Sequence, residues 1–170
     1  MRRYVPKLSA MLLSALLAMA LSVSVAFAAS PHFISASAHL SGANLIVSFK
    51  EAGLGANQLI NYTASADATA VYVCVNRGGA NPSAQNKATV SGPVSASGTF
   101  SSGKNGNVTA SLTLNPPSAG GFSCPSGQSL EVASVSYTNV AITDTTNGVT
   151  EPISGTFSTG CLLPDVRGAC

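Results

Sequence analysis

The chain has 170 residues, of which 45% are hydrophobic and only 8% are charged, and its formal net charge is +2 at pH 7. Arg2, Arg3 and Lys7 supply three of the eight basic residues, so the rest of the chain has five basic and six acidic residues, a net charge of −1. A nearly neutral chain with scattered charges offers no basic surface, which argues against nucleic acid or an anionic membrane as a partner.

Residues 1–28 have the pattern of a secretory signal peptide. A basic start precedes an apolar run at residues 8–25, and Ala26 and Ala28 supply the small residues before a cleavage point. The run is near spanning length, so a retained membrane anchor is the alternative, but no basic stop-transfer residue follows it. We expect cleavage before Ala29 and a secreted, extracellular protein, with association with a cell wall left open.

Apolar and polar residues alternate through most of the remaining chain, which is the pattern of half-buried β-strands. Val, Ile and Thr are frequent in these stretches and favour the pleated surface of a sheet. The alternation predicts strands at residues 34–40, 45–49, 60–64, 71–75, 90–100 and 108–114.

Turn sequences separate these stretches. "SGAN" at residues 41–44 is a turn, and "SGKNGN" at 102–107 predicts a hairpin because Asn105-Gly106 tolerates positive φ. "DTTNG" at 144–148 predicts another hairpin, and "NRGGANP" and "NPPSAGG" are loops.

The stretch at residues 130–142 changes phase twice. Leu130 and Val132 share one parity, Val135 and Tyr137 take the other, and Val140 returns to the first. Each one-residue slip would turn side chains to the opposite face, so we expect β-bulges at residues 133–134 and 138–139. A hairpin at 138–139 is the rival explanation.

Eight or nine short strands with regular turns predict an all-β fold, a single antiparallel β-sandwich with an immunoglobulin- or fibronectin-like arrangement as the default analogy. We expect the sandwich at residues 29–160, followed by a C-terminal tail at 161–170. No motif identifies a family.

The four cysteines lie in a chain that we expect to be exported, which favours disulfides. Four cysteines allow three pairings, and we favour Cys74–Cys124 and Cys161–Cys170. A zinc site would need closer Cys or His spacing, and a catalytic thiol would need a basic neighbourhood with a histidine, so both remain weaker alternatives.

Catalytic patterns are weak. His32 and His39 are seven residues apart, so on a regular strand they would face opposite ways, and we expect both to be exposed. No serine-nucleophile elbow or phosphate-binding loop occurs. Glu131 and Asp144 are interpreted as outward charges at strand edges. The sequence predicts neither an enzyme nor a cofactor or metal site.

Binding is best supported at the polar loop, residues 76–87, because loops on rigid sheets commonly carry recognition. Tyr62 and Tyr137 share the parity of apolar neighbours and are assigned to the core or its rim, whereas Tyr72 lies on the opposite parity to its valine neighbours. The candidate binding residues are Tyr72, Asn76, Arg77, Asn81, Gln85, Asn86 and Lys87. A solvated loop held by Cys74 is the plainer interpretation.

The sequons at Asn61 and Asn107 would be N-glycosylation acceptors in a eukaryotic pathway only. The sequence thus predicts a secreted, non-enzymatic protein with a structural, surface or interaction role, whose partner is an extracellular protein or cell-wall component. One alternative is a small hydrolase or carbohydrate-active module that joins Asp67 or Glu131 with His39. Another is a self-assembling fibre subunit that uses the alternation at residues 33–40. Oligomeric state and host stay open.

Overall fold

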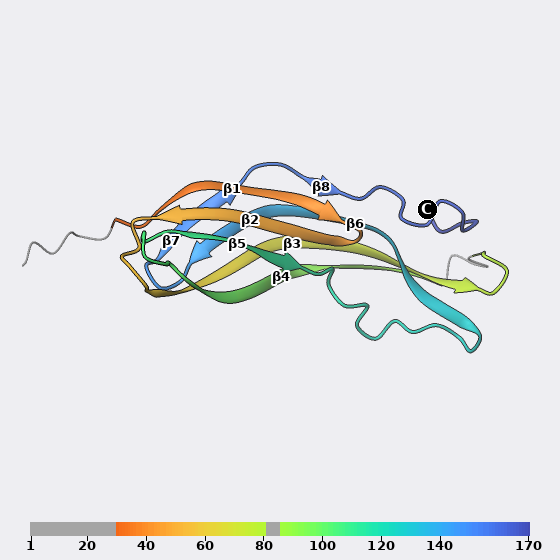
Figure 1. The fold of residues 1–170 in the computed structure, drawn as a ribbon. Coiled ribbons are helices and arrows are strands. Elements are labelled where there is room, and N and C mark those ends of the chain that lie inside the picture. Colours follow the sequence, from red (N-terminus) through yellow and green to blue (C-terminus); the bar gives the residue numbers. More distant parts are fainter. Residues whose placement is uncertain (1–29, 81–85) are drawn as a thin grey trace, which may run out of the picture.

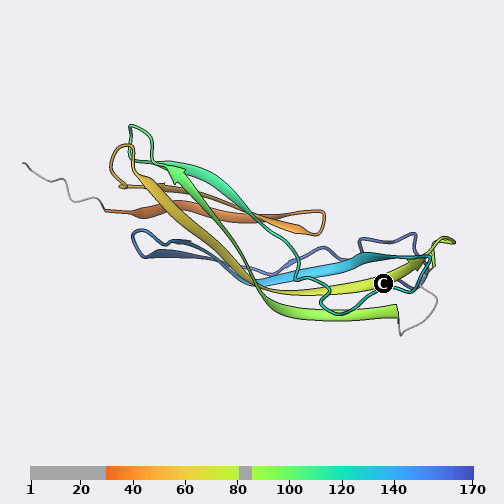
Figure 2. The ribbon, with the colours of Figure 1, turned by 90° about the horizontal axis from the view of Figure 1, so that it is seen from below.

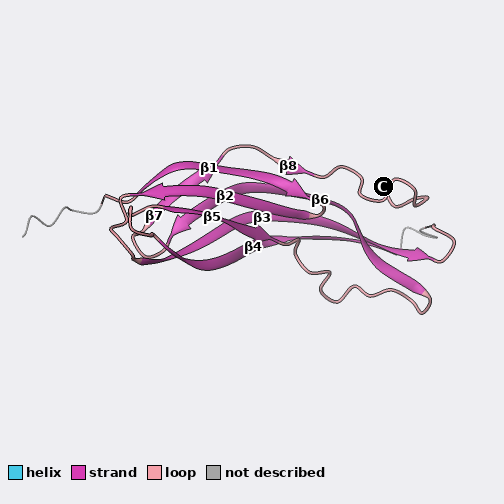
Figure 3. Ribbon diagram, in the orientation of Figure 1, coloured by secondary structure: helices cyan, strands magenta, loops and turns pink. Residues whose placement is uncertain are grey.

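A computed structural model describes residues 30–80 and 86–170, which form strands joined by turns and loops (Figure 3). The expected signal peptide lies outside these residues. None of the described residues belongs to a helix that is long and apolar enough to cross a membrane. The eight strands of the described part are β1 (His32–Ser41), β2 (Asn44–Ala52), β3 (Leu59–Asn76), β4 (Lys87–Ser101), β5 (Val108–Leu114), β6 (Gln128–Asp144), β7 (Val149–Ile153) and β8 (Phe157–Ser158).

These strands form two antiparallel sheets that share one core (Figure 1). Sheet A has the order β1-β2-β5. Sheet B has the order β4-β3-β6-β7, and β8 pairs with a part of β6 that β7 does not reach. The predicted all-β class is confirmed at this level.

The core is built from the inward parity of both sheets. Phe49 of β2 and Tyr62 of β3 have ring centroids 4.5 Å apart, and Phe33 and Phe100 pack around them. Tyr137 is fully buried, and its hydroxyl donates to the carbonyl of Ala43 at 2.7 Å. Burial of this ring raises its pKa to about 12. Tyr62 and Tyr137 therefore belong to the core, as the parity indicated.

Strand β3 is longer than the sequence predicted. Residues 60–64 and 71–75 were expected as separate strands, but one strand of 18 residues contains both. The linking stretch places Ala66, Ala68 and Ala70 inward, where they are at most 4% exposed. Alanine has a weak β-propensity, so this continuity arises from close packing between the sheets and not from local preference.

Both expected bulges are present in β6. Its register against β3 shifts between Ser65 and Asp67, where Asn139 and the residue after it lie opposite one residue of β3. It shifts again between Val71 and Tyr72, where Ala133 is the extra residue of β6. Asn139 has φ of 51°, a conformation that asparagine tolerates better than most residues. The hairpin alternative at residues 138–139 is therefore wrong.

The three predicted turns have different outcomes. Residues 41–44 join the β1–β2 hairpin, and residues 144–148 join the β6–β7 hairpin. The turn at 102–107 joins β4 to β5, but β4 pairs with β3 and β5 pairs with β2. The predicted hairpin is wrong because this turn carries the chain from sheet B to sheet A.

A bulge also changes the expected faces of β1. The register against β2 shifts between Phe33 and Ser35, which leaves Ile34 53% exposed instead of inward. His32 and His39 are both exposed. Residues seven apart face opposite ways only on a regular strand, and the bulge between the two histidines makes β1 irregular.

Sheet B continues beyond the end of sheet A (Figure 2). The hydroxyl of Tyr137 reaches Ala43, in the turn that ends sheet A, and Tyr137 pairs with Ala68. The residues of β3 after this point have no facing strand. We call this part the distal end: it contains the end of β3, the start of β6, the loop at residues 115–127, the described residues of the polar loop and the C-terminal tail.

Candidate functional site

Both disulfides lie at the distal end. Cys74 of β3 is bonded to Cys124 in the loop before β6, and Cys161 is bonded to Cys170 within the C-terminal tail. The prediction of a disulfide-stapled fold is confirmed, with the favoured pairing. Because no described cysteine is free, the thiol and zinc alternatives have no cysteine to use.

Each face of the distal part of sheet B has its own cover. On one face, the Tyr72 hydroxyl donates to the carbonyl of Pro117 at 2.6 Å, and Cys74 anchors the same loop. On the other face, Val73 and Ala133 pack with Ala169 of the tail.

Because both faces are covered, the prediction that Tyr72 belongs to the binding surface needs a correction. The parity that separates Tyr72 from the valines exists, but Tyr72 is only 8% exposed, and Val73 on the opposite parity is fully buried. Burial also raises its pKa. Tyr72 holds the 115–127 loop and contributes no surface to the polar loop.

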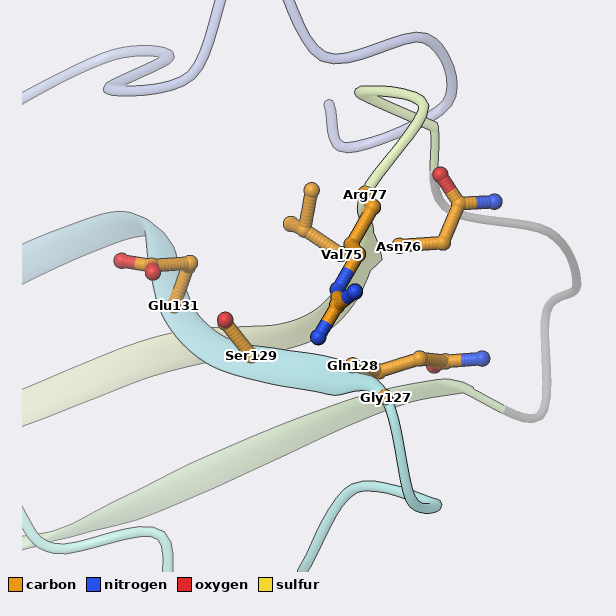
Figure 4. Close-up of a pocket in the computed structure, with 7 residues that line it drawn as sticks. All are labelled: Val75, Asn76, Arg77, Gly127, Gln128, Ser129 and Glu131. Carbon is orange, nitrogen blue, oxygen red and sulfur yellow. The ribbon is translucent and has the colours of Figure 1, made fainter.

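A shallow pocket of about 360 Å³ opens beside the tail, where β3 ends and β6 begins (Figure 4). Arg77 extends across the face of β6 toward Ser129 and Gln128, while the carboxylate of Glu131 points away from the guanidinium. The pocket lining consists of Val75, Asn76, Arg77, Gly127, Gln128, Ser129 and Glu131.

Hydrogen bonds fix the frame of this pocket. The side-chain oxygen of Asn76 accepts from the backbone N–H groups of Gly78 and Ala80, at 2.9 and 3.1 Å. The side-chain amide of Asn86 donates to that of Gln128 at 3.4 Å. The guanidinium of Arg77, in contrast, forms no hydrogen bond or ion pair with another described residue. It is an exposed charge with five donors at the rim of the pocket.

The polar loop is only partly described. Asn76, Arg77, Asn86 and Lys87 come together around the end of sheet B, whereas Asn81 and Gln85 lie outside the described residues. Lys87 is half-buried and pairs with Val73 at the start of β4.

The sequence did not reveal that the tail docks here. The backbone N–H of Arg167 donates to the Gly79 carbonyl at 3.2 Å, and Arg167 forms a bridge with Ala80. Arg167 is exposed, so it adds a third basic residue near Arg77 and Lys87. The cysteine pattern predicted that the tail is tethered to itself, but it contained no signal for the surface that the tail covers.

A second polar cluster lies at the other end of the core and was also missed. Glu51 is fully buried, and within the described part of the chain neither its carboxylate oxygens nor the Tyr62 hydroxyl has a hydrogen-bond partner. Burial raises the pKa of Glu51, and the nearby Asp144 carboxylate adds to this rise while the Tyr62 hydroxyl partly opposes it. The alternation contained the signal, because Glu51 shares the inward parity of Phe49.

Asp144 is also buried, which corrects its assignment as an outward charge. Its carboxylate accepts from the backbone N–H groups of Thr146 and Asn147 at 2.8 and 2.9 Å, and from the Asn147 side chain at 2.6 Å. The acid therefore stabilises the 144–148 turn from within.

The residues of the hydrolase alternative do not form a cleft. Asp67 is exposed on the outer face of sheet B, where it accepts from the Asn139 side chain at 2.8 Å. Glu131 is exposed on the tail side of the same sheet, whereas His39 is exposed on sheet A, across the core. The described residues also contain no group of three or more His, Cys, Asp or Glu side chains that could hold a metal ion.

The two sequon asparagines are both exposed. The side-chain oxygen of Asn61 accepts from the Thr99 hydroxyl at 2.6 Å, and Asn107 lies at the end of the 102–107 turn.

No protein-family model and no curated protein matches this chain. Among solved structures, it is similar to the solution structure of R. palustris CsgH, with 12% sequence identity over 75% of this chain and 91% of that chain. The TM-score is 0.22, so the likeness carries no argument about fold or function. The function must be argued from the residues of this chain.

Proposed function

We propose that this protein is a secreted, non-enzymatic β-sandwich protein that recognises an extracellular partner through the pocket beside Arg77. The observation that carries the proposal is the guanidinium of Arg77, which has no partner among the described residues and lies at the rim of a pocket on a disulfide-stapled frame. An exposed arginine in a loop at the end of a rigid sheet, with a polar rim around it, is typical of recognition surfaces. The partner is either a protein or a cell-wall component that presents acidic groups.

Secretion is supported by the targeting pattern of the first 28 residues together with two disulfides, which form in oxidising compartments. The intact mass of the exported protein should correspond to a chain that starts at Ala29 and contains no alkylatable thiol. A mass that includes residues 1–28 would contradict the export proposal.

The finer fold assignment rests on strand order. In the immunoglobulin and fibronectin description, sheet A corresponds to strands A-B-E and sheet B corresponds to strands C′-C-F-G. The disulfide differs, because Cys74–Cys124 joins β3 to the loop before β6 and not the two sheets to each other. We therefore propose an immunoglobulin- or fibronectin-like sandwich with its own staple. No arrangement of the described residues favours the hydrolase alternative.

Arginine replacement tests the recognition proposal. The wild-type protein, Arg77→Ala and Lys104→Ala would be immobilised and exposed separately to the secreted proteins and to the cell-wall fraction of the producing cells. Lys104 lies in the 102–107 turn at the opposite end, so its variant removes the same charge without touching the pocket. We expect Arg77→Ala to lose most of the material captured from one fraction and Lys104→Ala to retain it. Equal capture by all three proteins would eliminate the pocket as the contact surface.

A further inference from the structure

Strand β4 is a long edge of sheet B with little protection against pairing. It has fifteen residues, and it pairs only with β3 among the described strands. No charged residue occurs between Lys87 and Lys104. Exposed edges are normally protected by charges, bulges or prolines, and β4 has a regular register with Pro93 alone as a protecting residue.

The side chains of β4 reveal which backbone groups face the open side. The hydroxyls of Ser91 and Ser97 lie 2.8 Å from the hydroxyls of the threonines directly opposite on β3, and Thr99 donates to the residue opposite it at 2.6 Å. Such close approach is typical of non-hydrogen-bonded pairs, whose N–H and C=O groups point away from the neighbouring strand. Pro93, which has no N–H to offer β3, shares this parity. The odd-numbered residues of β4 therefore direct their backbone groups outward.

The inward side chains of the same strand are incompletely covered. Val94, Ala96 and Phe100 are half-buried, although their partners Ala66 and Ala64 on β3 are at most 4% exposed. An additional strand at this edge would cover the apolar side chains and satisfy the outward backbone groups together.

We propose that β4 pairs antiparallel with β4 of a second copy, in a register centred on Gly98. In this register Ser95 lies opposite Ser101 of the second copy, and Ser97 lies opposite Thr99 of the second copy. Four such pairs around the two-fold axis, each exchanging two hydrogen bonds, give about eight backbone bonds. Pro93 of each copy lies beyond the paired segment, so no position that needs a donor falls on a proline.

The edge is matched to a copy of itself. Its outward backbone N–H and C=O groups recur at every second residue, so they can pair with those of an identical antiparallel strand related by a two-fold axis. Its side chains from residue 88 to 101 carry no charge that would repel such a strand. The net charge of −1 for the chain after Lys7 adds little repulsion between copies. Because the β4 edge of each copy is used up in this pairing, the contact closes as a dimer and does not propagate as a fibre.

The first test removes one outward donor. Ser97→Pro deletes an N–H that points away from β3, so it should leave the fold as intact as Pro93 does, while Ser97→Ala removes only the hydroxyl. Sedimentation of each purified protein over roughly a hundredfold concentration range gives the dimer dissociation constant. Loss of one bond from each copy should raise this constant roughly thirtyfold for Ser97→Pro, and Ser97→Ala should resemble the wild type. A wild-type protein that stays monomeric throughout, or a Ser97→Pro variant that dimerises equally well, would overturn the proposal.

A charge exchange tests the register without proline. The variant with Ser97→Lys and Thr99→Lys places like charges opposite each other across the axis, and so does the variant with Ser97→Glu and Thr99→Glu. Each should be monomeric alone, and an equal mixture of the two should form a heterodimer. A mixture that remains monomeric, or single variants that still dimerise, would refute pairing in this register. Arg77→Ala should dimerise normally, because the pocket lies at the other end of sheet B.

Discussion

The buried acid Glu51 should make the fold less stable as the pH rises. Its side chain is fully buried and has no hydrogen-bond partner among the described residues, and burial raises its pKa above the ordinary value of 4.5. Below pH 4.5 the carboxyl is neutral in both folded and unfolded chains. Between pH 4.5 and the higher folded-state pKa, only the unfolded chain ionises, so the folded state loses about 1.4 kcal/mol per pH unit from this group.

Glu51→Gln removes this ionisation with little change in shape. We expect the variant to be more stable than the wild type at neutral pH, with a difference that shrinks toward zero near pH 4.5. Urea unfolding at half-unit pH steps measures this difference, and Glu151→Gln serves as the control because Glu151 is exposed on β7. Parallel stability profiles for wild type and Glu51→Gln would refute the reasoning, as would a destabilised variant at neutral pH, which would indicate a paired carboxylate.

Three further predictions concern the stapled end and the bulge. Replacing Cys161 and Cys170 by serine should release the tail and cost roughly 2–3 kcal/mol of local stability, measured as faster exchange of the Arg167 amide, which donates to the Gly79 carbonyl. Tyr72→Phe should lower the free energy of unfolding by about 1 kcal/mol in urea titrations, because the bond to Pro117 is lost. Asn139→Ala should destabilise by about 1–2 kcal/mol and more than Asn139→Gly, since both lose the bond to Asp67 but only alanine is strained at φ of 51°; equal losses would contradict this.

Alternation along the chain predicted much of the fold. The two phase slips around Val135 located both bulges of β6, because a strand can restore its buried face only by adding a residue. The cysteine spacing similarly favoured the pairing that is present. The bulges depend on the alternation of neighbouring residues, and the disulfides depend on the positions of four cysteines. Both can be read directly from a sequence.

The failures have a common physical origin in long-range packing. The turn at residues 102–107 has hairpin chemistry, but turn chemistry fixes a reversal and not the sheet that receives the next strand. Tyr72 was assigned to a surface because alternation assumes one wet face, but the 115–127 loop covers the Tyr72 face and the tail covers the Val73 face. Glu51 was overlooked since charged residues are rarely buried, although its parity was inward.

The positions of the disulfides explain how the pocket and the fold depend on different forces. Where both sheets face each other, the aromatic cluster around Tyr62 supplies the burial that stabilises the fold. Beyond Ala68, sheet B has no facing sheet, and irregular segments provide its two covers. Such segments bury little apolar surface per residue and lose much conformational entropy on ordering, so cross-links stabilise them most effectively. The Cys74–Cys124 bond, which spans 50 residues, and the tail clip both act there. Reduction should therefore loosen the frame of Arg77 while the two-sheet core persists.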